Sequence, residues 1–541
     1  MELHLATVIE RIAAVVGEHP VVVQDGRVTS WREFDDRASR LASVLWASGL
    51  RPHSKVGLYL TNSPEYLEVW LAALKIRCIP VNINYRYVED ELAYLLDDAG
   101  CEAIVFPTGL SDRVDAVLPG RDIACVLQVA VESDALIDGA RRYEDAVTSA
   151  GPLEPMKRSE DDHFLLYTGG TTGLPKGVIY QMGGLTRELG AMIGAFVGGG
   201  AVTGGQDIVT TAQRANEAGA SLTGLILPPL MHGTGTSLAI MTLLTGGTVV
   251  LTGETFDPAV ALRTLETHRA SVIALVGDAF MRPLLVELDR RCSDGDPVDL
   301  SSVQLVMSSG AMLSSESKHA FLAHAPQCLV IDTLAASEAP MGSSITTAGG
   351  GPTTAAFELR PGTRVLDETD ADIEAGSGRT GRVAVLSDNP IGYYNDPAKT
   401  AETFREIDGE RYSLPGDWAT VEADGTIRLL GRGSQCINTG GEKVFPEEVE
   451  EALKTHPAVM DALVFGVDDE KWGQRIEAVV SLRDEMAATE PELKGHVRTK
   501  LADYKAPKGI LQVATVPRSP NGKADYRAAR ALISDSAVTP A

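Results

Sequence analysis

Short apolar runs alternate with helical patterns along the first hundred residues, and this alternation limits the fold more than any other feature of the sequence. Residues 55–60, 78–83 and 102–106 have the length and composition of buried strands. Between the first two runs, Ser63 precedes a helical pattern that has Pro64 at its first position. Strands that alternate with helices favour parallel sheets covered by helices. We therefore predict an α/β fold.

The composition excludes several classes of protein. The chain has 541 residues, with 48 Lys and Arg against 74 Asp and Glu, and a formal charge of −26. Such a chain lacks the basic face that unspecific binding to nucleic acid or to anionic membranes requires. No apolar run approaches the roughly 20 residues of a membrane-spanning helix, and the N-terminal segment lacks the basic stretch that begins a signal peptide.

The cysteines point to a reducing compartment. The six cysteines lie far apart and include no C-x-x-C pair, so we expect reduced thiols rather than disulfides or a zinc site. A cytoplasmic protein is the prediction. The sequence leaves open whether the chain is a monomer or a homodimer.

The sequence changes character near residue 433. After Gly431-Arg-Gly-Ser434, a helical pattern opens at Pro446, and strand-like runs occupy 461–467, 476–482 and 511–516. Residues 434–541 carry 14 Lys and Arg and 17 Asp and Glu, so nearly all of the acidic excess lies before this unit. We therefore divide the chain into a large domain, residues 1–432, and a small domain, residues 433–541.

The segment Thr168-Gly-Gly-Thr-Thr-Gly-Leu-Pro-Lys-Gly177 follows a strand-like run and has the composition of a polyphosphate-binding loop. Its glycines let the backbone approach phosphates, its hydroxyl and N–H groups can donate to phosphate oxygens, and Lys176 adds a positive charge. The segment is not a Walker A loop, because Pro175 precedes the lysine and Gly177 follows it.

Further motifs follow this loop in order along the chain. They are Pro228-Pro-Leu-Met-His232-Gly, Ser309-Gly310-Ala311, Ser337-Glu338, Gly416-Asp417, Gly431-Arg432, Gly440-Gly441-Glu442, Pro446-Glu-Glu-Val-Glu450 and Pro517-Arg-Ser-Pro-Asn-Gly-Lys523. Together they resemble the motifs of the adenylate-forming superfamily, which includes acyl-CoA synthetases, peptide-synthetase adenylation domains and luciferases. The resemblance implies an N-terminal AMP- and acyl-binding domain of mixed parallel sheets packed with helices plus a β-barrel-like subdomain. It also implies a small, mobile α+β C-terminal domain with a catalytic lysine.

The resemblance implies roles for charged residues. Joining a carboxylate to ATP brings two anions together, so Lys523 would bridge the acyl carboxylate and the α-phosphate and stabilise the charge that develops. Glu338 would bind Mg²⁺, which is usually held by one or two carboxylates and phosphate oxygens. Asp417, with Arg432 nearby, would accept hydrogen bonds from the ribose hydroxyls. His232 would either gate the acyl pocket or be a structural histidine.

The resemblance also implies which residues contact each substrate. The expected ATP and AMP contacts are Thr168, Gly169, Gly170, Thr171, Thr172, Gly173, Lys176, Ser309, Gly310, Ala311, Asp332, Thr333, Leu334, Ser337, Asp417, Arg432 and Lys523. The expected residues of the CoA step are Gly440, Gly441, Glu442 and Lys443, and the expected hinge is Ser434. ATP, Mg²⁺ and CoA are the expected cofactor and cosubstrates.

Three features depart from the superfamily pattern. Leu334 stands where an aromatic usually stacks on adenine, and the two alanines after it replace part of a Tyr-Gly pattern. Ser434 stands where the hinge is commonly Asp or Lys, and Pro415 where Thr is usual. None of these changes removes a charge that adenylation needs, so we expect effects on adenine affinity and on the movement of the small domain.

The sequence therefore predicts an ATP-dependent acyl-CoA synthetase, an AMP-forming acid–thiol ligase. An adenylate-forming enzyme with another acceptor, such as a luciferase, is one alternative. A non-catalytic binder of nucleotide or acyl ligand is another, although the presence of both Lys176 and Lys523 argues against it. The few residues after Lys523 leave no room for the carrier domain of a peptide synthetase.

The expected acyl pocket indicates the kind of acid. Small and flexible residues dominate the segments expected to line it, which are residues 231–238, 276–279, 309–312 and 334–336. We predict a wide apolar pocket for a long or bulky acid rather than acetate. Residues 82–88, 337–344 and 436–443 are similar to actinobacterial fatty-acyl ligases, a branch that includes ligases of steroid side chains.

Overall fold

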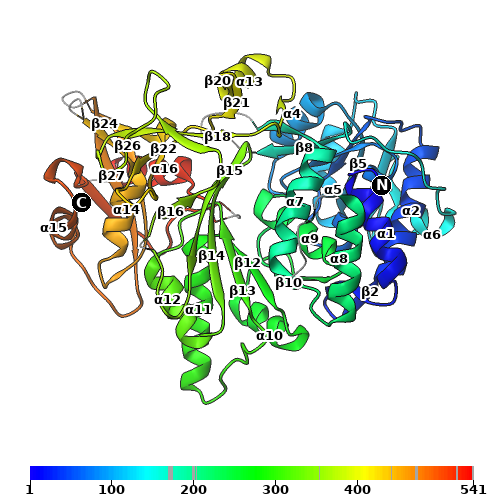
Figure 1. Ribbon diagram of the computed structural model, residues 1–541, viewed down its shortest axis with the longest axis horizontal. Coiled ribbons are helices and arrows are strands. Elements are labelled where there is room, and N and C mark those ends of the chain that lie inside the picture. Colours follow the sequence, from blue (N-terminus) through cyan, green and yellow to red (C-terminus); the bar gives the residue numbers. More distant parts are fainter. Residues whose placement is uncertain are drawn as a thin grey trace.

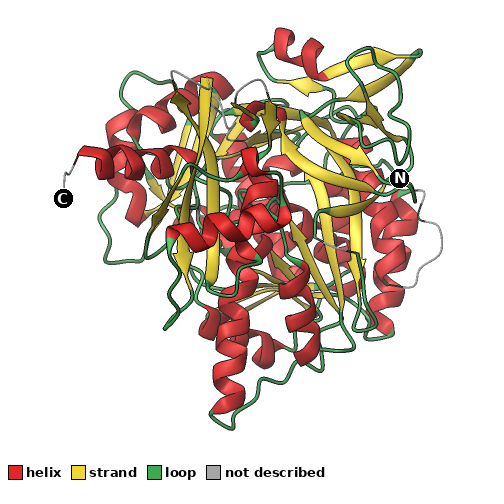
Figure 2. Cartoon of the chain, turned by 90° about the vertical axis from the view of Figure 1, so that its left-hand side faces the viewer, coloured by secondary structure: helices red, strands yellow, loops and turns green. Residues whose placement is uncertain are grey.

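In the computed structural model, three sheets organise the described chain, and helices cover their faces (Figures 1 and 2). The structure describes residues 1–168, 175–197, 202, 204–352, 354–439, 442–469, 473–519 and 522–538. The two chain ends lie toward opposite ends of the long axis (Figure 1).

The first sheet begins as a parallel sheet and continues as an antiparallel one. Its parallel part runs in the order β1 (Pro20–Gln24), β11 (Thr248–Leu251), β10 (Thr223–Ile226), β12 (Val272–Leu275), β13 (Leu305–Ser309) and β14 (Leu329–Ala336), with β2 (Arg27–Ser30) antiparallel to β1. The antiparallel part continues through β15 (Ala339–Thr346), β16 (Ala356–Leu359), β23 (Ile427–Arg432), β22 (Asp417–Val421), β18 (Thr380–Leu386), β21 (Glu410–Ser413) and β20 (Phe404–Ile407), and β17 (Thr363–Leu366) pairs with β18. The change of direction occurs between β14 and β15.

The second sheet lies beside the first and is parallel over most of its width. Its order is β19 (Gly392–Tyr393), β9 (Lys176–Gln181), β8 (His163–Thr168), β4 (Ile79–Asn82), β3 (Lys55–Leu58), β5 (Cys101–Pro107), β6 (Cys125–Val129) and β7 (Arg141–Arg142). Only β19, β9 and β8 pair in antiparallel fashion within this described sheet.

The third sheet belongs wholly to the C-terminal part of the chain. Its order is β25 (Glu442–Val444), β24 (Ile437–Thr439), β27 (Gly473–Leu482) and β26 (Val459–Asp469), and β28 (Gly509–Gln512) runs parallel to β27. A separate apolar core lies between this sheet and its helices. The division at residue 432 stays a prediction, although the third sheet and its core fit a small C-terminal domain.

The helices cover the sheets in layers. Those of the N-terminal part are α1 (Leu5–Val16), α2 (Trp31–Ala47), α3 (Pro64–Lys75), α4 (Glu89–Ala99), α5 (Ser111–Val117), α6 (Tyr143–Ser149), α7 (Met182–Phe196), α8 (Gly205–Glu217), α9 (Gly233–Leu244), α10 (Pro258–His268), α11 (Gly277–Ser293), α12 (Ser315–His324) and α13 (Pro397–Thr403). Those of the C-terminal part are α14 (Pro446–Lys454), α15 (Glu490–Lys500) and α16 (Tyr526–Val538). Among the described residues, no helix combines the length and the apolar character that crossing a membrane requires.

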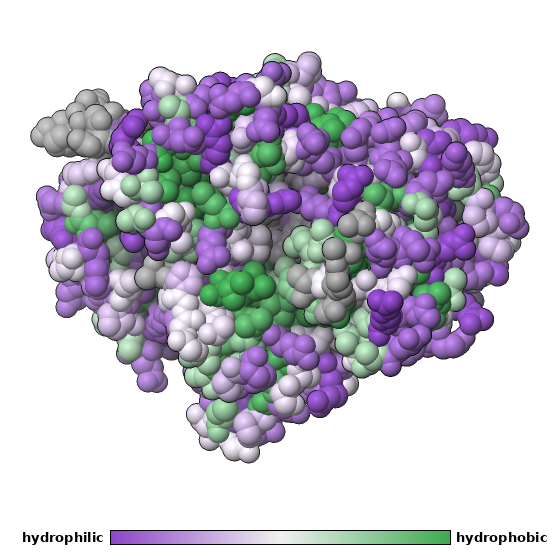
Figure 3. Space-filling view, viewed as in Figure 1, coloured by the Kyte–Doolittle hydropathy of each residue, from purple (hydrophilic) through white to green (hydrophobic). Residues whose placement is uncertain are grey.

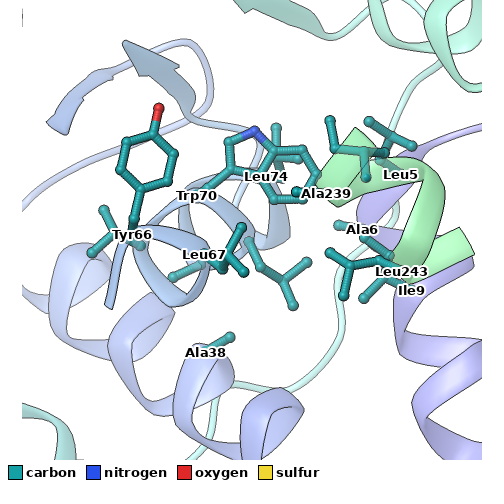
Figure 4. Packing of buried hydrophobic residues seen from close by; sticks show 14 of the residues in the cluster. Leu5, Ala6, Ile9, Ala38, Tyr66, Leu67, Trp70, Leu74, Ala239 and Leu243 are labelled. Atoms are coloured by element: carbon teal, nitrogen blue, oxygen red, sulfur yellow. The ribbon is translucent and has the colours of Figure 1, made fainter. Parts of the chain in front are cut away.

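The largest apolar core lies between the first two sheets, where α1, α2, α3 and α9 meet. Figure 4 shows Leu5 and Ile9 of α1, Leu67 and Trp70 of α3, and Leu243 of α9 pointing into one packed region. These side chains are almost completely buried, so each contributes roughly 1.5–3 kcal/mol of hydrophobic free energy. Helices α10, α11 and α12 cover the opposite face of the first sheet with a second core.

Most of the elements expected from the sequence are confirmed, and so is the α/β fold class. Strands β3, β4 and β5 lie within one or two residues of the predicted runs. The Ser63 hydroxyl accepts the N–H of Tyr66, with Pro64 at the first position of α3. The strand expected at 511–516 is displaced: β28 begins at Gly509 and ends at Gln512, because its parallel pairing with β27 sets its register.

A buried ion pair connects α2 to α3 in the large core. The Arg37 guanidinium donates to both oxygens of Glu68, at 2.8 and 3.1 Å, and to Glu144. The Tyr143 hydroxyl donates to the second oxygen of Glu68 at 2.7 Å. Glu68 is completely buried, so its charge depends wholly on these partners.

Replacing Glu68 is therefore expected to destabilise the large domain. Glu68→Ala leaves Arg37 without its buried counter-ion, with only the half-exposed Glu144 remaining, and Tyr143 without an acceptor, which lowers the free energy of unfolding by about 3–5 kcal/mol. Urea unfolding followed by tryptophan fluorescence measures this, because Trp31 and Trp70 lie in the same core. Arg32→Ala is the control: its ion pair with Glu18 is exposed and contributes less than about 1 kcal/mol. Equal effects of the two changes would contradict a structural role for the Arg37–Glu68 pair.

Candidate active site

Polar side chains gather where the first sheet changes from parallel to antiparallel. Strand β13 ends at Ser309, whose hydroxyl donates to the Thr333 carbonyl of β14 at 3.0 Å. Thr234, in the first turn of α9, donates to the Ser309 carbonyl at 3.4 Å. Gly310 follows with a φ of +88°, a backbone conformation that glycine adopts readily. The carboxyl ends of parallel strands are where ligands bind in sheets of this type.

The turn between β14 and β15 carries Ser337 and Glu338, and the second sheet holds it in place. The Tyr393 hydroxyl of β19 donates to Glu338 Oε1 at 2.5 Å, and the Tyr180 hydroxyl of β9 donates to the Ser337 carbonyl. Burial, with the nearby Glu338 charge second, raises the pKa of both phenols, so they remain donors. Glu338 is buried at the junction of the two sheets.

Asp417 and Arg432 face each other at the ends of β22 and β23. They are register partners, and Arg432 Nε lies 3.8 Å from Asp417 Oδ1. The other oxygen, Asp417 Oδ2, is buried and has no hydrogen-bond donor among the described residues. Burial raises the pKa of this carboxyl, an effect that Arg432 partly offsets. A buried acceptor of this kind is suited to hydroxyl groups of a ligand.

Lys523 reaches this site from the C-terminal part of the chain. A methyl group placed on Gly310 would lie 3.5 Å from Lys523 Cε. Loss of hydration among the surrounding protein, followed by the Arg432 charge, lowers the pKa of the Lys523 ammonium, while Glu338 and Asp417 oppose the shift. By surface area, Lys523 is nevertheless exposed.

One face of the molecular surface is hollowed. Figure 3 shows the face hollowed near its centre, between strands β14 and β15 and helix α7 of Figure 1. His232 directly precedes α9. Burial, followed by the charge of Lys523, lowers the pKa of His232 to about 3. The imidazole is therefore neutral at physiological pH, which fits either of the roles expected for it.

Thr168 and Lys176 are placed at the base of the predicted phosphate loop. They pair across the antiparallel strands β8 and β9, and Gly169, Gly170, Thr171, Thr172 and Gly173 lie outside the described residues. The Lys176 ammonium forms an ion pair with Asp396, which caps α13. This hydrogen bond lowers the pKa of Asp396.

Two of the expected nucleotide contacts, Asp332 and Leu334, are buried. Asp332 is buried 3.4 Å from the Lys318 ammonium of α12, and burial raises the pKa of this carboxyl to about 6. Lys318 also donates to Ser344 of β15 at 3.0 Å. Leu334 is buried in the apolar cluster of the antiparallel strands, with Met341 and Phe357.

The expected CoA and hinge residues are only partly described. Gly440 and Gly441 lie outside the described residues, whereas Glu442 and Lys443 contribute backbone to β25, which pairs with β24. Ser434 lies in the short 3₁₀ turn Gly433–Gln435 between the first and third sheets.

Several residues of the site were not expected from the sequence. Tyr393 and Tyr180 hold the Glu338 turn, Thr234 contacts Ser309, and Asp396 binds Lys176. Asp396 carried a usable signal, because an Asp-Pro pair marks a helix start. The two tyrosines had none, since each meets its partner through pairing between distant strands.

Comparison with known proteins identifies the family. Residues 9–385 match the AMP-binding enzyme family, and residues 448–523 match the AMP-binding enzyme C-terminal domain. The 3-oxocholest-4-en-26-oate–CoA ligase of Rhodococcus rhodochrous is 42% identical over 544 residues, covering 98% of this chain and 96% of the relative. The medium/long-chain-fatty-acid–CoA/3-oxocholest-4-en-26-oate–CoA ligase of Mycolicibacterium smegmatis is 40% identical, with the same coverage.

Solved structures share the fold over nearly the whole chain. The anthranilate CoA ligase AuaEII in complex with anthranoyl-AMP has a TM-score of 0.83 at 21% identity, covering 99% of this chain and 98% of that one. ATP-bound MatB from Rhodopseudomonas palustris has a TM-score of 0.80 at 24% identity, covering 99% and 100%. The chain therefore belongs to the AMP-binding, adenylate-forming enzyme family and, within it, to the CoA ligases.

Proposed function

We propose that the protein activates a long or bulky carboxylic acid, a steroid side-chain acid among them, as an acyl-adenylate and transfers the acyl group to CoA. The observation that carries this proposal is the position of Lys523 beside Gly310, within electrostatic range of Glu338, Asp417 and Arg432. Relatives that align over almost the full length are ligases of 3-oxocholest-4-en-26-oate and of medium- and long-chain fatty acids.

In the first half-reaction, a carboxylate oxygen attacks the α-phosphorus of ATP. The new bond joins acyl oxygen to phosphorus, and the bond from the α-phosphorus to the bridging oxygen breaks to release pyrophosphate. Both reactants are anions, so the barrier is largely electrostatic. Lys523 would donate to the carboxylate and the α-phosphate, and those anions would favour its protonated form despite the lowered pKa of the free site.

Fixed groups around Lys523 would bind the nucleotide. Asp417 Oδ2, a buried acceptor without a donor among the described residues, would accept from the ribose hydroxyls. Arg432 would remain beside it and offset the buried charge. Lys176 would leave Asp396 and bind the β- and γ-phosphates with the loop that precedes it.

Glu338 has the chemistry for Mg²⁺. Its carboxylate is buried at the site and is oriented by Tyr393. Among the described residues, no group of three metal-binding side chains could hold an ion alone. One carboxylate is nevertheless sufficient for Mg²⁺ when phosphate oxygens and water complete the shell. The ion would neutralise phosphate charge, and Glu338 would hold it next to the pyrophosphate leaving group.

In the second half-reaction, the CoA thiolate attacks the acyl carbonyl carbon. The new carbon–sulfur bond forms as the carbon–oxygen bond to AMP breaks, so AMP leaves. We propose that the small domain, residues 433–541, rotates about Ser434 between the two half-reactions. This rotation would withdraw Lys523 and bring residues 440–443 to the acyl-adenylate, as in a hinge-and-lid mechanism.

An apolar strip leads away from the site along the first sheet and suits a long acid. Thr333, Ile331 and Leu329 alternate onto one face of β14, and Ile331 is the register partner of Ile345. Leu329 and Ile345 are 43% and 51% exposed. The four residue steps from Leu329 to Thr333 span roughly 13 Å. This is about the length of a fused ring system. Figure 3 shows hydrophobic surface over β14, beside the hollow.

An acid panel tests the proposed function. We expect pyrophosphate release with ATP, Mg²⁺ and fatty acids from C8 to C18, and with a steroid side-chain acid, followed by AMP release when CoA is added. Each buried methylene contributes about 0.8 kcal/mol, so kcat/KM for a C12 acid should exceed that for acetate by several orders of magnitude. A preference for acetate would overturn the proposed substrate class, and nucleotide binding without turnover of any acid would overturn the proposed activity.

Lys523→Ala separates the two half-reactions. Loss of the ammonium removes stabilisation of charge in the first transition state only, so adenylation should fall at least about a hundredfold. Thioester formation from synthetic acyl-adenylate and CoA should be spared. Lys500→Ala, at an exposed lysine in the last turn of α15, is the control and should change neither rate. An equal loss in both half-reactions would be evidence against two orientations of the small domain.

Ser434→Pro tests the hinge. Proline fixes φ near −65°, so the backbone at residue 434 could no longer rotate freely between orientations. Adenylation should stay largely intact while thioester formation is blocked, as measured by single-turnover assays of each step. Ser434→Ala keeps the backbone free and should retain both steps. Unimpaired thioester formation in Ser434→Pro would place the hinge elsewhere.

A further inference from the structure

The first turns of α11 support the segment that carries Lys523. Gly522 has a φ of +74°, and a methyl group placed on it would lie 3.2 Å from Ala279 Cβ and from Val276 Cγ1. The backbone next to Lys523 therefore approaches the start of α11 so closely that a side chain there would crowd its neighbours. This is one contact between α11 and the C-terminal part of the chain.

The second contact is made by Arg282, on the same helix. Its guanidinium Nη1 donates to the Met460 carbonyl of β26 at 2.6 Å. Its Nε donates to Asp278 at 3.2 Å, and Asp278 in turn accepts from the N–H and hydroxyl of Ser314, each at 3.1 Å. Arg282 and Asp278 are 6% and 7% exposed. Arg282 is thus held on the large domain and donates across to the small one.

Met460 is connected through its neighbour Asp461 and through Arg518 to Gly522, the residue before Lys523. Asp461, the next residue of β26, accepts from Arg518 at 2.6 and 2.7 Å. Arg518 also donates to the Gly522 carbonyl at 3.1 Å. The two contacts of α11 are therefore joined within the small domain. Two contacts on one rigid body fix its orientation, where one contact would allow it to turn.

An outer ion pair flanks this connection but contributes little. Glu316 of α12 lies 3.1 Å from Arg483 and 3.7 Å from Arg282 Nη2. The Glu316 side chain is 59% exposed, and exposed pairs contribute about 0–1 kcal/mol. The buried Arg282–Met460 hydrogen bond, which is charge-assisted, is stronger.

We propose that Arg282 is a positioning residue for adenylation: its hydrogen bond to the Met460 carbonyl holds the small domain in the orientation that places Lys523 beside Gly310. The inference rests on the proposed function. Arg282 contacts neither substrate nor the reacting atoms. Its hydrogen bond to Met460 breaks when the small domain rotates. Arg282 therefore affects the rate of the first half-reaction and not that of the second.

Arg282→Met tests the proposal, because methionine keeps much of the apolar volume and removes the donors. The adenylation rate at saturating ATP and acid should fall about 10- to 100-fold, the effect of losing one or two hydrogen bonds to a charged group. Thioester formation from synthetic acyl-adenylate and CoA should stay within twofold of the unmodified protein. Arg282→Lys keeps one donor and should recover part of the adenylation rate.

Arg290→Met is the matched control on the same helix. Arg290 is 57% exposed and pairs only with Glu287 and Asp294 of α11 among the described residues, so both half-reactions should be unchanged. Equal loss of both half-reactions in Arg282→Met, or no loss in either, would overturn the proposal.

Hydrogen–deuterium exchange separates this proposal from the proposed function. In Arg282→Met without substrates, exchange should rise in peptides that cover residues 459–469 and 517–525 and stay unchanged in Arg290→Met. A protein that turns over no acid but shows this difference would retain the positional role of Arg282 and lose the proposed activity. Unchanged exchange would overturn the role of Arg282 whatever the activity.

Discussion

Strand β14 has a parallel neighbour on one side and an antiparallel neighbour on the other, and the site depends on this asymmetry. Parallel strands β13 and β14 bring Ser309 and Thr333 to one edge. The tight turn into β15 then returns the chain at the same edge and leaves Glu338 there. A wholly parallel sheet would need a helical crossover after β14, which would carry the carboxylate away from its neighbours.

The charges of the molecule are distributed to suit anionic substrates. The chain has a formal charge of −26, yet Lys523, Arg432 and Lys176 lie at or near the site. The second sheet contributes Lys176 of β9 and two neutral donors, Tyr180 and Tyr393. Association with ATP and CoA is thus governed by local geometry, because the overall field of the protein repels both.

Much of the fold could be predicted from the sequence, and so could the site residues that lie within sequence motifs. The strand–helix alternation predicted the parallel sheets, and the ordered motifs identified Lys523, Glu338, Asp417 and Arg432, which the structure brings together. Local patterns could not reveal contacts between distant strands, so Tyr393 on Glu338 was missed. They also could not reveal that Asp332 of β14 pairs with Lys318 on α12.

Under the proposed function, the ion pair between Lys176 and Asp396 would set a threshold for anions that bind to the predicted phosphate loop. The cation is already neutralised by a carboxylate that is fixed at the start of α13, so an arriving anion must compete with it. A single small anion exchanges one partner for another and gains almost nothing. Under the proposed function, a polyphosphate would engage Lys176 together with the preceding segment and would thereby compete with Asp396. The pair would therefore favour anions that present many oxygens over monovalent ones.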